Sequence, residues 1–154
     1  MNDGNYLMAF ASDFGLDVRN RSFAVLNDKI EKYGIVLSSE DINSLSVAVS
    51  QALNDSDRFE FKESAAVKIA EKFASSSFID KRNFVKMISE LTESFYMFRN
   101  EIGYDVSDND IIDTMFMYFE RRCGGSIELM MNSYFEKIVN DEPIDDREEN
   151  VTDD

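Results

Sequence analysis

The segment Asp80–Ile102, DKRNFVKMISELTESFYMFRNEI, decides the fold of this chain. Its large apolar residues recur at steps of three and four, which places them on one face of an α-helix. These residues are Phe84, Ile88, Leu91, Phe95, Phe98 and Ile102. A helix of this length would measure roughly 33 Å, at 1.5 Å per residue. An apolar stripe that long can pack against several shorter helices, so it predicts a helical bundle.

Shorter helices are predicted on either side of this segment because the same periodicity recurs along the chain. They cover residues 22–33, 39–54, 63–75, 108–123 and 126–139. Three helix starts combine a capping residue with an apolar neighbour that can pack against the first turn. These capping residues are Ser38, Asp80 and Ser107. We therefore predict a mainly all-α, single-domain bundle of five to six helices around a long helix at 80–102.

Two short segments leave room for a small exception to the helical pattern. Residues 35–37 read Ile-Val-Leu, which suits either a short strand or an extended connection. Residues 58–61 read Arg-Phe-Glu-Phe and alternate as a strand does. The helix between the two segments turns the chain back. A two-stranded element that pairs 35–37 with 59–61 is therefore an open alternative.

The negative charge of the chain is unevenly distributed. The net charge is −15, and residues 141–154 contain eight acids and one arginine, which amounts to −7. The preceding residues therefore carry −8. We predict one helical domain over 1–140, with residues 1–5 disordered, and an acidic disordered tail over 141–154. A negative body repels phosphate groups, so neither nucleic acid nor a membrane is expected as a partner.

Several chemistries are disfavoured by what the sequence lacks. It contains no histidine, the commonest general base and metal ligand, and its one cysteine, Cys123, cannot form an internal disulfide. We recognise no catalytic, cofactor-binding or metal-binding motif and predict no cofactor. An enzyme is thus the less favoured class, with carboxylate, tyrosine, lysine, serine or cysteine chemistry open to it.

The sequence also favours one compartment. No apolar run approaches the ~20 residues that span a bilayer. The N-terminal apolar run at 6–11 is too short for the core of a signal peptide. A single cysteine suits a reducing interior. We therefore expect the protein to be cytoplasmic.

Several blocks of the sequence resemble a known family. They are FYMFRNE at 95–101, SDNDIIDTM at 107–115, CGGSIEL at 123–129, and the earlier segments 37–41 and 58–61. With their FYxFxNE and CxGS motifs, they are similar to an uncharacterised family of small helical proteins from clostridia and related Firmicutes. The similarity extends over residues 25–131. It implies a bacterial, cytoplasmic protein and no particular activity.

The end of the long helix holds the residues that we select as a candidate partner-binding site. They are Tyr96, Arg99, Asn100 and Glu101. An arginine, an amide and a carboxylate beside two phenylalanines exceed what a helix end requires. The four residues either form a polar cluster within the fold or lie on a surface that recognises a partner.

The sequence favours a non-catalytic bacterial module for protein interaction or regulation, because it combines an acidic arm with the lack of catalytic motifs. Two other functions stay open. A core rich in phenylalanine and methionine could leave a small-molecule pocket between the long helix and the helix at 108–123. Alternatively, an acidic face could mimic nucleic acid and occupy a DNA-binding protein.

Overall fold

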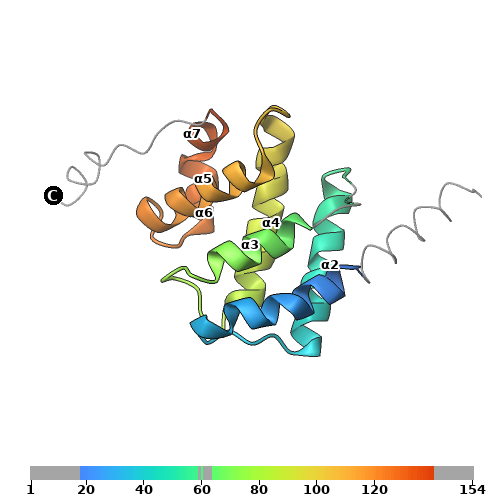
Figure 1. The fold of residues 1–154 in the computed structure, drawn as a ribbon. Helices are drawn as coiled ribbons and strands as arrows, with labels where there is room; N and C mark the ends of the chain where they lie inside the picture. Colours follow the sequence, from blue (N-terminus) through green and yellow to red (C-terminus); the bar gives the residue numbers. More distant parts are fainter. Residues whose placement is uncertain (1–17, 59, 61–63, 141–154) are drawn as a thin grey trace, which may run out of the picture.

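A computed structural model describes residues 18–58, 60 and 64–140. A helix over 18–30 continues into the 3-10 turn η1. The order of the named elements is η1 (Glu31–Tyr33), α2 (Ser39–Asp55), α3 (Ala65–Phe73), α4 (Phe84–Glu101), α5 (Asp108–Arg121), α6 (Ile127–Ser133) and α7 (Phe135–Val139). The predicted all-α fold is confirmed. The long helix α4 contacts α2, α3, α5, α6 and α7 and thus occupies the centre of the bundle (Figure 1).

The apolar stripe of α4 forms the middle of the core, as predicted. Phe84, Ile88, Leu91, Phe95 and Phe98 are each no more than 1% exposed. Ile102, which follows the helix, is only partly buried and packs against the same core. The spacing of these residues therefore explains why five other helices can assemble on one long helix.

Capping side chains fix the starts of α2 and α5. The Ser38 hydroxyl accepts a hydrogen bond from the Asp41 N–H at 3.0 Å, and the Ser38 N–H donates to the Asp41 carboxylate, also at 3.0 Å. The Ser107 hydroxyl accepts from the Asp110 N–H at 3.1 Å. Both helices therefore begin where the sequence predicted, because the cap satisfies N–H groups that have no partner within the helix.

The predicted start of the long helix at Asp80 is wrong by a few residues. Asp80 does exchange hydrogen bonds with Asn83, at 2.8 and 3.2 Å. These bonds close a turn over 81–83, and α4 begins only at Phe84. The Asn83 amide also donates to the Phe78 carbonyl at 3.1 Å, which ties the turn to the preceding chain.

Residues 35–37 form no strand. The two-stranded element that the sequence left open, 35–37 with 59–61, therefore lacks its first strand. The Asn27 side-chain amide explains why. Its oxygen accepts from the Leu37 N–H at 2.7 Å, and its nitrogen donates to the Leu37 carbonyl at 3.0 Å. One side chain thus satisfies both backbone groups that a strand would use. Positions 59 and 61 lie outside the described residues.

The predicted helix at 126–139 is two helices. The break falls at Tyr134, between α6 and α7. The Tyr134 ring packs against Tyr118 of α5 at 5.5 Å between centroids, while Phe135 stacks on Phe98 of α4 at 5.0 Å. Consecutive aromatic residues are therefore held by different helices, which accounts for the change of direction.

A glycine turn joins α5 to α6. Gly125 has φ of +81°, and its N–H donates to the Phe119 carbonyl at 3.0 Å. A Cβ atom at this position would lie 2.5 Å from the Cβ and Cγ atoms of Phe78. Both the backbone conformation and the close approach of Phe78 therefore require glycine here.

Residues 1–17 and 141–154, and with them the predicted disordered N-terminus and acidic tail, lie outside the described residues. Within the described ranges, no helix has the length and apolar character needed to cross a bilayer.

Candidate functional site

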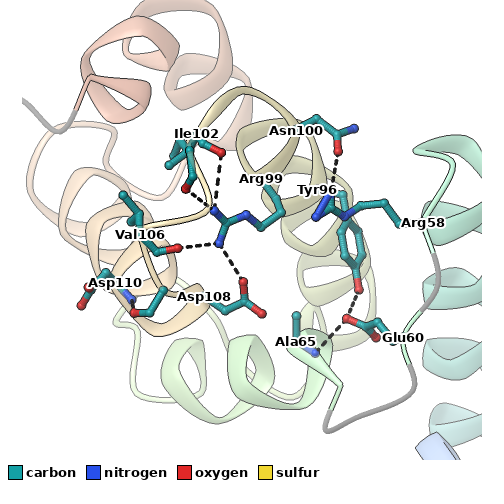
Figure 2. A network of polar contacts seen from close by, with 12 residues as sticks. Arg58, Glu60, Ala65, Tyr96, Arg99, Asn100, Ile102, Val106, Asp108 and Asp110 are labelled. Carbon is teal, nitrogen blue, oxygen red and sulfur yellow. Dashed lines mark hydrogen bonds and ion pairs between the residues drawn. The ribbon is translucent and has the colours of Figure 1, made fainter.

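The four candidate residues at the end of α4 have different environments. Tyr96 is 2% exposed and Arg99 is 9% exposed, whereas Asn100 and Glu101 are exposed. Figure 2 shows that Tyr96 reaches toward Glu60, while Arg99 reaches toward the loop that follows α4. Two of the four residues thus belong to a polar network within the fold, and the other two border it on the surface.

Arg99 ties the loop 103–107 to the end of α4. Its guanidinium donates to the carbonyls of Gly103 and Val106 at 2.6 and 2.7 Å. It also approaches the Ile102 carbonyl at 3.5 Å and forms an ion pair with Asp108 at 3.0 Å. An arginine fork suits this task because it presents several donors in one plane. The loop and the first residue of α5 are therefore positioned by one side chain.

Tyr96 connects α4 to the segment that precedes α3. Its hydroxyl donates to the Glu60 carboxylate at 2.5 Å, and the Ala65 N–H donates to the same oxygen at 3.2 Å. Arg58 from this segment also donates to Asn100 at 2.7 Å. Burial, followed by the charge of Glu60 and the hydrogen bond to it, raises the pKa of Tyr96 well above its usual value of 10.0.

A third buried polar residue, Arg19, was not identified from the sequence. It is 5% exposed and donates from Nη2 to the hydroxyl of Ser50 in α2. Burial lowers the pKa of Arg19, and the negative charge of the Glu60 carboxylate opposes that shift. Among the described residues, Arg19 Nε, the second Glu60 oxygen and the Ser64 hydroxyl are buried without a hydrogen-bond partner. The region of the bundle around Arg19, Glu60 and Ser64 is therefore polar rather than apolar.

We expect the free energy of unfolding of the Tyr96→Phe variant to fall less steeply at alkaline pH than that of the native chain. The folded chain retains the Tyr96 proton to higher pH than the unfolded chain. The contribution of Tyr96 to the free energy of unfolding is therefore complete below about pH 10. Above that value it falls by about 1.4 kcal/mol per pH unit. Urea unfolding of both proteins between pH 7 and pH 11 measures this difference. Equal slopes for the two proteins above pH 10 would contradict the assignment.

An acidic groove adjoins the loop that Arg99 holds. It has a volume of about 320 Å³. It is lined by Ile102, Asp105, Val106, Asp110, Ile111, Asp113, Thr114, Ile138 and Val139. Ile111 and Ile138 are buried, whereas the three aspartates are exposed. The acidic groove therefore offers an aliphatic base with carboxylates around it.

The loop beside the acidic groove carries an exposed aromatic side chain. Tyr104 is 95% exposed, and its neighbours in sequence, Gly103 and Asp105, are also exposed. Glu101 adds a further exposed carboxylate at the end of α4. Exposed aromatic residues next to apolar hollows are typical of surfaces that bind other proteins.

Cys123 is not an activated thiol, and the described acids do not gather into a metal site. Burial raises the pKa of the Cys123 thiol to about 11, so the thiol is protonated at neutral pH. The described acids form no cluster of three or more that could hold a metal ion, and this includes the aspartates of the acidic groove.

The fold and these contacts define a small all-α protein in which a central helix positions a buried polar network and an acidic groove. The chain belongs to DUF6323, a family of unknown function, whose model matches residues 22–146. This span includes residues 25–131, over which the sequence resembles an uncharacterised family. No curated protein and no solved structure matches the chain.

Proposed function

We propose that this chain is a non-catalytic bacterial interaction module, active in the cytoplasm, that binds a cationic segment of a partner protein in the acidic groove. One observation carries the proposal: an aliphatic hollow has only carboxylates as its charged groups, next to an almost fully exposed tyrosine. A leucine-sized side chain suits the hollow. Lysine or arginine side chains on either side of it suit Asp105 and Asp110.

The position of the candidate residues supports this assignment. Glu101 is exposed at the end of α4, and Arg99 fixes the backbone of the loop that holds Tyr104 and Asp105. A preorganised loop lowers the entropy cost of binding. In this proposal Arg99 and Tyr96 support the binding surface from within, while the exposed residues contact the partner.

The sequence left open a second function, a small-molecule pocket lined by phenylalanine and methionine between the long helix and the helix at 108–123. The contacts of these residues give it less support than the acidic groove gives to the interaction module. No phenylalanine or methionine lines the acidic groove. At the interface of α4 and α5, Phe98, Met115 and Phe119 are fully buried. The acidic groove borders α5, α7 and the loop after α4, and its lining is aliphatic and acidic.

The proposal predicts that a short peptide in which two arginines flank one leucine binds the acidic groove. Titration into the ¹⁵N-labelled full chain should shift the amide resonances of Tyr104, Thr114 and Val139. The double variant Asp105→Asn/Asp110→Asn should bind the peptide about threefold to tenfold more weakly, because each exposed ion pair contributes about 0.2–1 kcal/mol.

Matched variants separate the groove from the overall negative charge. Glu93→Gln/Glu128→Gln removes two exposed charges elsewhere, on α4 and α6, and should leave the affinity unchanged. A peptide with glutamates in place of the arginines should not bind. Equal weakening by both double variants would instead assign the binding to the net charge of the chain and would overturn the proposal.

A further inference from the structure

A second groove has the opposite character from the acidic groove. It lies between the end of the first described helix, α3 and the start of α5, and has a volume of about 610 Å³. Its lining consists of Asp28, Lys29, Lys32, Tyr33, Lys68, Glu71, Lys72, Ser75, Asn109, Ile112 and Asp113. We call it the lysine groove, because four of the eight lysines of the chain line it.

The charge of the lysine groove contrasts with that of the chain. Four lysines and three carboxylates give the lining a net charge of +1, whereas the rest of the chain carries −16. The lining of this groove is therefore more favourable to an anion than the composition of the chain as a whole. A local field of opposite sign is a means of concentrating a charged ligand at one place.

Two of the four lysines are paired with acids, and the other two have no such partner among the described residues. Lys29 pairs with Glu71 at 3.8 Å, and Lys72 pairs with Asp113 at 3.5 Å. Among the described residues, Lys32 and Lys68 have no carboxylate within ion-pair distance. The ammonium of Lys32 instead lies 5.3 Å from the centre of the Tyr33 ring. Within the described part of the chain, the groove therefore contains two lysine ammonium groups that no carboxylate neutralises.

The other lining groups indicate what else a ligand must carry. Tyr33 is 44% exposed and offers a ring face for a planar group. Ser75 and Asn109 supply hydrogen-bonding side chains. The volume lies within the range of about 300–1,000 Å³ that is typical of small-molecule sites. A bare inorganic anion would leave most of this space unused.

From these features we infer that the lysine groove binds an organic monophosphate with a planar ring, of the size of a nucleoside monophosphate. Lys32 and Lys68 contact the phosphate as point charges. The Tyr33 ring packs against the planar group. The lysines already paired with Glu71 and Asp113 shape the wall of the site, and those carboxylates disfavour ligands with several phosphates.

Titration of the full-length protein with adenosine monophosphate tests this inference. Amide resonances of Lys32, Tyr33 and Lys68 should shift saturably, with a dissociation constant below about 1 mM. Inorganic phosphate and adenosine, tested separately, should each bind more weakly than the whole molecule. The double variant Lys32→Gln/Lys68→Gln should weaken binding about tenfold, because charge-assisted contacts to the phosphate are lost.

The control is Lys81→Gln/Lys86→Gln, which makes the same charge change at exposed lysines outside the groove. It should leave binding unchanged, and both double variants should retain the unfolding midpoint of the native chain. Lack of saturation up to about 10 mM ligand would overturn the inference. So would equal weakening by the two double variants. Phosphate binding as tight as the whole molecule would exclude the ring subsite, and adenosine binding as tight would exclude the phosphate subsite.

Discussion

Replacing Phe119 with alanine is expected to lower the free energy of unfolding by about 3–5 kcal/mol. Phe119 lies on α5, is fully buried, and packs edge-on against Phe73 of α3 at 5.3 Å between ring centroids. Phe78 contacts the same ring at 6.2 Å. The loss follows from the buried apolar area and from the cavity that the surrounding helices cannot fill. Urea unfolding at neutral pH measures it.

Phe116→Ala is the matched control for this prediction. Phe116 lies on the same helix and packs edge-on against the same Phe73 ring, also at 5.3 Å, but it is only partly buried. We expect it to cost about 1–2 kcal/mol, since less apolar area is removed from contact. Equal losses for the two variants would mean that the ring contact with Phe73, rather than burial, determines stability.

The sequence predicted the core of this fold well because the decisive signal is local. The period of three and four in α4 identifies residues such as Phe84 and Phe98 as buried without knowledge of their neighbours. The serine caps at Ser38 and Ser107 are also local, since each bonds to a backbone N–H three residues later. Features determined within one turn of helix can be read from a single sequence.

Contacts between residues far apart in the sequence explain why some elements were predicted incorrectly. Whether residues 35–37 form a strand depends on Asn27, ten residues earlier, whose amide satisfies both backbone groups of Leu37. The break in the last predicted helix depends on Tyr118 and Phe98, which hold successive rings from different helices. Neither partner can be identified from periodicity, because periodicity describes one helix at a time.

The arrangement of the candidate residues at the end of α4 could not be predicted from the sequence. The mixture of polar and aromatic residues at 95–101 indicated that the end of α4 is unusual. It did not show that Tyr96 pairs with Glu60, which lies 36 residues earlier in the chain. Arg19 gave no signal at all, because a lone arginine near a helix start is ordinarily exposed. Both grooves combine residues from separate helices, so only the assembled fold shows them.

The second large effect is expected at Arg99, where replacement by methionine should cost about 3 kcal/mol. Methionine fills much of the same space but donates no hydrogen bond. The carbonyls of Gly103 and Val106 lose their donor, and Asp108 loses its ion-pair partner. Because Arg99 is 9% exposed, water cannot replace the guanidinium without disturbing the core.

Two controls separate the geometry of Arg99 from its charge. Arg99→Lys retains the charge but loses the fork, and should cost about half as much. Arg58→Met removes a surface arginine that makes one side-chain contact in the same network, to Asn100, and should change stability by less than about 1 kcal/mol. Urea unfolding ranks the three variants. A loss for Arg99→Met no larger than that for Arg58→Met would contradict the assigned role.

The Arg99 variant also connects the fold to the proposed function. If the guanidinium holds loop 103–107 in place, its loss should accelerate amide hydrogen exchange at Tyr104 and Asp105. The cationic peptide should then bind more weakly although none of its contacts has been removed. The amides of α3, which receives no hydrogen bond from Arg99, should retain their protection relative to global unfolding. Faster exchange throughout the bundle would instead show that Arg99 stabilises the whole fold and does not specifically order this loop.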